Sequence, residues 1–215
     1  MNMKKIILLI FGIGTLSFVS PKRANVLIIG DSISIGYTPF VQKALIDKAN
    51  IIHNPGNASN IKNGLEQVEK WLGNTNWDII HFNWGLHDLR YSNPESTVYG
   101  NRDKINGKVT CTPEEYGKNL EELVLRLKKT GAILIFATTT YVPEGETRRL
   151  VNDDKRYNEV AVKIMKKHNI QVNYLNKISK KIHAKEALAE GNVHYTKKGY
   201  ELLAKPVIKI ITKNL

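Results

Sequence analysis

The stretch VLIIGDSISIGY, residues 26–37, runs from an apolar segment through Gly-Asp-Ser into a helical pattern. The apolar residues 26–29 predict a strand buried on both faces, as in a parallel sheet covered by helices. Gly30 permits a tight turn at the carboxyl end of this strand, where such sheets place their functional groups. Two interpretations follow: Asp31 or Ser32 caps the helix, or Ser32 is a nucleophile.

Strand and helix patterns alternate along the rest of the chain. Further strands are expected over residues 50–53, 77–83, 133–140 and 171–175. Helices are expected over residues 34–49, 61–72, 113–130 and 153–168, and in most of the remainder. This alternation predicts an α/β fold, a three-layer α/β/α sandwich around a mainly parallel five-stranded sheet.

The first residues have the pattern of a secretory signal. MNMKK is followed by a mostly apolar run over residues 6–19, shorter than the roughly 20 residues of a membrane span. We expect a signal peptide over residues 1–20, with cleavage near Ser17, and a single domain over residues 21–215. The protein is therefore expected to be exported, to the periplasm or beyond, without stable membrane insertion.

The chain is strongly basic, with a net charge of +12. Its lysines are scattered over several helical patterns and form no compact arginine-rich block with interleaved aromatic residues, so no nucleic-acid partner is expected. The single cysteine, Cys111, excludes an intrachain disulfide.

Polar and glycine-containing segments follow the expected strands. Ser32 follows the first strand, Pro55-Gly56-Asn57 the second and Gly85-Leu86-His87-Asp88 the third, and His194 is expected to open the last helix. The carboxyl ends of parallel strands share one edge of the sheet, so these segments should converge. Independent capping explains each segment separately but not their joint placement, which favours a functional site.

These segments resemble the blocks of the SGNH hydrolases, also called the GDSL esterase and lipase superfamily. Gly30-Asp31-Ser32 matches the block of the nucleophilic serine, and Asn54-Pro55-Gly56 resembles the second block. Gly85-Leu86-His87-Asp88 aligns with the third block, usually Gly-X-Asn-Asp, and Val193-His194 with the last, usually Asp-X-X-His. The matches span nearly all of the chain after the signal.

The resemblance implies a flavodoxin-like sheet and ester hydrolysis through an acyl-serine intermediate, without a metal ion or cofactor. It implies that Ser32 is the nucleophile and His194 the base. The oxyanion hole would consist of the backbone N–H groups of Ser32 and Gly56 and the side chain of His87. Asp88 is expected to brace its own loop.

Two positions depart from the family pattern. His87 stands where the family has an asparagine, and an imidazole N–H can also donate a hydrogen bond to an oxyanion. Gly191 stands where the family has the aspartate that orients the catalytic histidine. Asn192, Glu190 or a backbone carbonyl are the alternatives for holding His194.

The substrate is indicated by two long segments at the expected active edge. The insertion between Leu89 and Thr112 carries tyrosines and arginines, and residues 141–149 are expected to form another wall. Tyr91, Tyr99, Arg90 and Arg102 suit a sugar better than a long acyl chain.

The first hypothesis is therefore hydrolysis of acetyl or other small acyl esters on a carbohydrate, with a small molecule or polysaccharide as substrate. Exported relatives with a similar third block resemble carbohydrate esterases. A lipid-directed esterase or thioesterase, and a non-catalytic glycan-binding descendant, remain alternatives.

Overall fold

The computed structural model describes residues 23–215, and the signal peptide predicted over residues 1–20 lies outside the described residues. The central sheet contains five parallel strands in the order β2-β1-β3-β6-β7. They are β1 (Ala24–Ile29), β2 (Ala49–His53), β3 (Ile79–Phe82), β6 (Ile133–Ala137) and β7 (Gln171–Asn173). The predicted parallel five-stranded sheet is confirmed.

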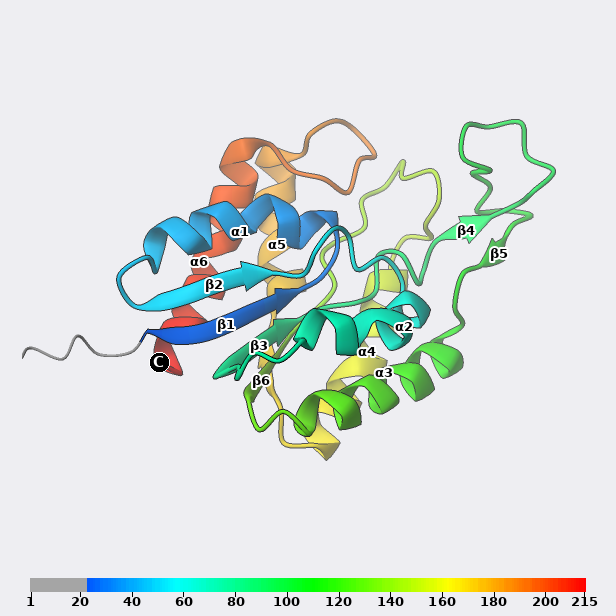
Figure 1. The fold of residues 1–215 in the computed structure, drawn as a ribbon. Coiled ribbons are helices and arrows are strands. Elements are labelled where there is room, and N and C mark those ends of the chain that lie inside the picture. Colours follow the sequence, from blue (N-terminus) through cyan, green and yellow to red (C-terminus); the bar gives the residue numbers. More distant parts are fainter. Residues whose placement is uncertain (1–22) are drawn as a thin grey trace, which may run out of the picture.

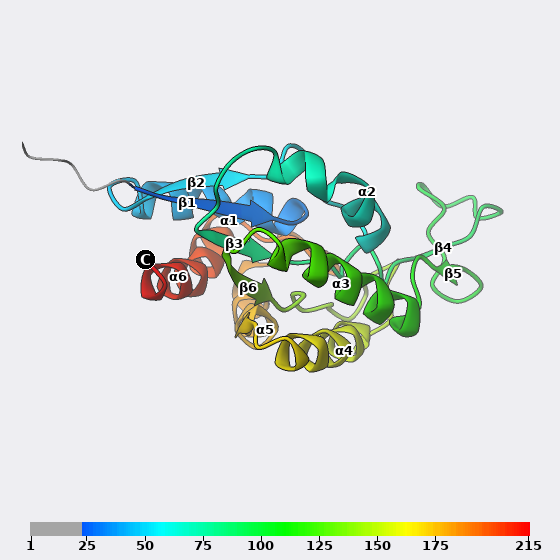
Figure 2. The same ribbon diagram turned by 60° about the horizontal axis from the view of Figure 1, so that its bottom comes forward.

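Helices cover both faces of this sheet (Figures 1 and 2). One layer contains α1 (Ser32–Ala44), α5 (Leu175–Glu186) and α6 (Lys197–Lys213), and the other contains α2 (Ile61–Leu72), α3 (Pro113–Lys128) and α4 (Asp153–Lys167). The three-layer α/β/α sandwich is thus confirmed. None of the helices within residues 23–215 is long and apolar enough to cross a membrane.

Strand β1 lies inside the sheet, where it pairs with β2 on one side and β3 on the other. Val26 is in register with Ile51 and Ile79, and residues 26–29 are fully buried. Helices on both faces explain why this strand is continuously apolar instead of alternating. Its carboxyl end leads directly to Ser32, so a rigid part of the core positions that side chain.

Two helix boundaries differ from the sequence prediction. Helix α1 begins at Ser32 because the Asp31 side chain accepts the N–H of Ile33 and caps it. The predicted helix covered residues 34–49, whereas α1 begins at Ser32 and ends at Ala44, with Pro39 inside it. Helix α6 begins only after Thr196, whose side chain caps it, so His194 precedes the last helix and does not open it.

The insertion after β3 forms a small antiparallel ribbon of β4 (Tyr91–Ser92) and β5 (Lys108–Val109). Figure 1 shows this ribbon projecting from the body of the molecule beyond the carboxyl ends of β1 and β2. Its base is held by hydrogen bonds from the Tyr91 N–H to the Arg148 carbonyl (2.7 Å) and from the Thr110 N–H to the Arg90 carbonyl (2.8 Å). The insertion is therefore connected to the loop over residues 141–149.

Candidate active site

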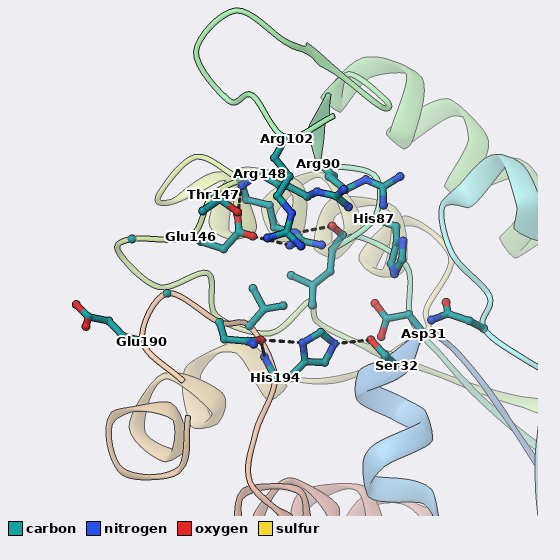
Figure 3. Close-up of a pocket in the computed structure, with 17 residues that line it drawn as sticks. Asp31, Ser32, His87, Arg90, Arg102, Glu146, Thr147, Arg148, Glu190 and His194 are labelled. Atoms are coloured by element: carbon teal, nitrogen blue, oxygen red, sulfur yellow. Dashed lines mark hydrogen bonds and ion pairs between the residues drawn. The ribbon is translucent and has the colours of Figure 1, made fainter. Parts of the chain in front are cut away.

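Three side chains form a hydrogen-bonded chain at the carboxyl edge of the sheet (Figure 3). Ser32 Oγ lies 3.0 Å from His194 Nε2, and His194 Nδ1 lies 2.8 Å from Asn192 Oδ1. Ser32 comes from the first turn of α1, while His194 and Asn192 come from the loop between α5 and α6. The fold thus joins residues from opposite ends of the chain into the arrangement of a nucleophile, a base and an orienting group.

The contacts of Asn192 determine the tautomer of His194. Asn192 Oδ1 also accepts the backbone N–H of His194, at 2.9 Å. Because a backbone N–H can only donate, the Asn192 atom at this position is the carbonyl oxygen and not the amide nitrogen. The same oxygen contacts Nδ1, so Nδ1 carries the ring proton and Nε2 accepts from Ser32 Oγ. This is the tautomer that a general base requires.

The backbone at Gly191 explains why an aspartate is absent from its usual position. Gly191 has a φ of 65°, and a Cβ atom added to it would lie 2.6 Å from the Gly145 carbonyl oxygen. A side chain at this position would be strained and would also clash. Asn192, one residue later, supplies the acceptor to His194, whereas Glu190 is exposed and has no hydrogen bond to the His194 ring.

His194 is half-buried, and its surroundings favour the neutral form. Burial lowers the pKa of His194 below its ordinary value, the Asp31 carboxylate opposes this shift, and the Arg149 guanidinium adds to it. The ring is therefore unprotonated near pH 7 and can take a proton from Ser32.

The expected oxyanion donors belong to Ser32, His87 and Gly56. The Ser32 N–H belongs to the first turn of α1, where a helix leaves its N–H groups without intrahelical acceptors. His87 lines the cavity, and burial lowers its pKa, so its ring is neutral with one N–H that can donate. Gly56 is exposed, with a φ of 68°, and it is the adjacent Asn57 that lines the cavity.

Buried polar side chains connect the loops that carry these groups. Asn54 Oδ1 accepts the N–H of Gly30 at 2.9 Å, which joins the second block to the first. Asp88 Oδ1 accepts the N–H of Ile61 at the start of α2 (2.8 Å), and the Asp88 carbonyl accepts the N–H of Cys111 (3.0 Å). Burial raises the pKa of Asp88 to about 7. Asp88 therefore connects its loop to α2 as well as to the insertion.

A cavity of about 400 Å³ opens beside Ser32 and His194. Both long segments contribute to its walls, as the sequence predicts: the insertion provides Arg90 and Arg102, and residues 145–149 form a further side. The sequence analysis identified neither Arg148 nor Arg149 as a site residue. The sequence did hold one signal for these two arginines, since they are neighbours in a segment that was expected to form a wall of the site.

Of the four residues of the insertion that suit a sugar, Arg90 and Arg102 line this cavity and the two tyrosines do not. Tyr91 donates from its hydroxyl to Asp153 at 3.3 Å, and Tyr99 is 86% exposed with its ring beside the Arg102 guanidinium. Neither tyrosine lines the cavity, and no other phenylalanine, tyrosine or tryptophan of the described residues does.

The same fold occurs in solved ester hydrolases. An acetyl xylan esterase structure is 17% identical, with a TM-score of 0.69 over 87% of this chain and 99% of that one. A lipase/acylhydrolase from Enterococcus faecalis is 19% identical, with a TM-score of 0.69 over 88% and 96% of the two chains. An acetylxylan esterase from Geobacillus stearothermophilus is 18% identical, with a TM-score of 0.69 over 87% and 94%.

TesA is 14% identical, with a TM-score of 0.67 over 89% of this chain and 100% of that one. No family model and no curated protein matches the sequence. The fold that the motifs predicted is confirmed by these solved structures. The chain shares the fold of these ester hydrolases, and a serine and a histidine are in contact at the carboxyl edge of its sheet.

Proposed function

We propose that the protein is a serine esterase that removes acetyl or other small acyl groups from a carbohydrate. The observation that carries the proposal is the contact of Ser32 Oγ with His194 Nε2 at 3.0 Å, with Nδ1 held by Asn192. A serine and a histidine with only a structural role would not need to line an open cavity. Nor would the histidine need the tautomer in which Nε2 is free to accept a proton from the serine.

In the proposed mechanism, His194 Nε2 takes the proton of Ser32 while Oγ attacks the ester carbonyl carbon. The N–H of Ser32 and the ring N–H of His87 stabilise the negative charge that develops on the carbonyl oxygen. The C–O bond to the sugar then breaks, and the sugar oxygen takes the proton from His194. Water attacks the acyl-serine with His194 again as base, which releases the carboxylic acid and restores Ser32.

The cavity supports a small acyl group and a polar alcohol. Leu86 and Val193 are the only apolar side chains among its lining residues, and a long acyl chain needs a continuous apolar groove. Two of the four solved structures described above are named acetyl xylan esterases. These features favour the carbohydrate ester over the lipid-directed esterase or thioesterase.

The test is release of acetate from 4-nitrophenyl acetate and from acetylated xylan, with Ser32→Ala beside the wild type. We expect hydrolysis of both by the wild type and a loss of at least 10³-fold in the variant. Preference for long-chain acyl esters in a parallel panel would favour the lipid-directed alternative. Glycan binding without hydrolysis by the folded wild type would favour the non-catalytic alternative.

We further propose that the protein is exported, because residues 1–20 have the pattern of a signal peptide. Expression of the full chain in a bacterial host, followed by fractionation and N-terminal sequencing, tests this proposal. We expect a mature N-terminus near residue 18 in the periplasm or medium. An intact N-terminus on protein confined to the cytoplasm would contradict it.

A further inference from the structure

The wall of the cavity contains four arginines, together with the carboxylates of Asp31, Glu146 and Glu190. Arg90, Arg102, Arg148 and Arg149 all line it. Arg149 is buried, pairs with Glu146 at 3.0 Å and donates from Nε to the Leu86 carbonyl at 2.7 Å. Arg149 thus has protein partners that explain its burial.

The other three arginines have no carboxylate partner within residues 23–215. Glu146 is engaged by Arg149 and by the backbone N–H of Arg148, at 2.7 Å. The Nε atoms of Arg90, Arg102 and Arg148 are buried, and none has a hydrogen-bond partner among the described residues. Buried donors of this kind lose free energy unless water or a ligand satisfies them.

The three guanidinium groups also repel one another. Burial lowers the pKa of Arg148, and the charges of Arg90 and Arg102 lower it further. Lys104 adds positive charge nearby, since its Nζ donates to the Glu146 carbonyl at 2.6 Å. An anion bound among these groups would relieve the repulsion and accept their free N–H groups.

The arginines line the same cavity as Ser32 and His194, so an anion bound to them would lie beside an ester at Ser32. Figure 3 shows Arg90, Arg102 and Arg148 gathered across the cavity from Ser32 and His194. The carboxylate of Asp31 lies on the Ser32 side. An ester positioned at Ser32 therefore faces an arginine wall within the same cavity of about 400 Å³.

We propose that the glycan substrate carries a carboxylate, as a uronic acid does, and that Arg90, Arg102 and Arg148 bind it while Ser32 attacks a nearby acyl ester. The planar guanidinium group matches the two oxygens of a carboxylate and donates to both. The arginine wall thereby selects acidic over neutral acylated glycans. This inference rests on the esterase function proposed above.

The test compares acetylated polygalacturonate, which is acidic, with acetylated xylan as the neutral glycan. We expect the wild type to prefer the acidic substrate at least 10-fold in kcat/KM, and added salt to reduce this preference. Arg102→Gln should lower kcat/KM about 10- to 100-fold for the acidic glycan and much less for the neutral one. That range is typical for loss of one hydrogen bond to a charged group.

Lys108→Gln is the matched control, because Lys108 is exposed on the same ribbon and does not line the cavity. It removes the same charge and should leave both kcat/KM values within twofold. Equal rates of the wild type on the two glycans would overturn the inference. An equal loss of kcat/KM for the acidic glycan in Lys108→Gln and Arg102→Gln would also overturn it. Such a result would indicate that the acidic glycan is attracted by the positive charge of the ribbon in general and not by the arginine wall.

Calorimetric binding of trigalacturonate to Ser32→Ala separates this inference from the proposed function. Binding that Arg102→Gln weakens at least 10-fold supports the arginine wall even if the wild type hydrolyses no ester. Hydrolysis of acetylated xylan without trigalacturonate binding would leave the esterase function standing and overturn the acidic substrate.

Discussion

Asn192→Asp tests the hydrogen bond that orients His194. The substitution keeps the size of the side chain and replaces the amide with a carboxylate. Asn192 Oδ1 already accepts from Nδ1 at 2.8 Å and from the His194 N–H at 2.9 Å, so the new oxygen needs no rearrangement. The tautomer is unchanged, and the effect is therefore purely the added negative charge beside the ring.

The size of the effect follows from the distance and the burial of the ring. A carboxylate about 4 Å from an imidazolium charge interacts with it by roughly 4 kcal/mol at an effective dielectric constant of about 20. His194 is half-buried, and solvent screens part of this interaction, so we expect its pKa to rise by about 1 to 2 units. The same charge stabilises the imidazolium in the transition state, and we expect kcat/KM above that pKa to rise about 10-fold.

The assay is the pH profile of kcat/KM for 4-nitrophenyl acetate. In the wild type, activity should rise as His194 loses its proton, with a midpoint below 6.5, because burial lowers its pKa. The midpoint should move to higher pH in Asn192→Asp. Asn74→Asp is the control, since Asn74 is exposed in the loop between α2 and β3, and its profile should match the wild type.

An unchanged midpoint in Asn192→Asp, or a fall in activity at every pH, would refute the orienting role of Asn192. Asn192→Ala provides the opposite perturbation. It removes the acceptor at Nδ1, so the ring loses both its orientation and its fixed tautomer. We expect kcat to fall at least 100-fold with a smaller change in KM.

Three further predictions follow from the site. Gly191→Asp restores the usual family residue, but it should destabilise the fold by at least 1 to 2 kcal/mol and not raise kcat, because its Cβ would lie 2.6 Å from the Gly145 carbonyl oxygen at a φ of 65°. Chemical denaturation measures the stability and steady-state kinetics measures kcat. A variant that is as stable as the wild type and faster would contradict the argument from the Gly191 backbone. His87→Ala should lower kcat about 10²- to 10³-fold by removing an oxyanion donor, whereas His87→Asn should recover most of it, and equal losses in the two variants would speak against the donor role. Burial raises the pKa of Asp88 to about 7, so the folded state keeps a proton that the unfolded state releases near pH 4. As the pH rises from 4 to 7, the free energy of unfolding of the wild type should therefore fall relative to that of Asp88→Asn, by at most about 4 kcal/mol. The same pH dependence of unfolding in the two proteins would contradict this prediction.

The parts of the fold that depend on local signals were predictable from the sequence. Helix α2 has the predicted bounds, because Asn60 caps an amphipathic segment and Gly73 ends it. The capping box of Thr112 and Glu115 likewise placed the start of α3. The apolar run at residues 26–29 indicated a strand with helices on both faces, and that strand positions Ser32.

The start of α1 was predicted two residues late although a local signal was present, because the Asp31 side chain caps the helix at Ser32. The parts of the site that the sequence left open depend on long-range packing. The choice of Asn192 over Glu190 depends on the backbone of Gly191, which packs against another loop.

The arginine wall has the same origin. Arg102 and Arg148 come from two separate loops, which hydrogen bonds between the insertion and residues 141–149 hold together. No local sequence pattern predicts a contact between two loops that are far apart in the sequence.

Mass spectrometry of the protein after reaction with a 4-nitrophenyl phosphonate tests the central claim most directly. The account predicts a single adduct on the wild type, mapped to Ser32. The adduct should form only slowly in His194→Ala and should be absent from Ser32→Ala. A folded wild-type protein that remains unlabelled at Ser32, or that is labelled equally fast in His194→Ala, would contradict the assignment of Ser32 and His194 as nucleophile and base.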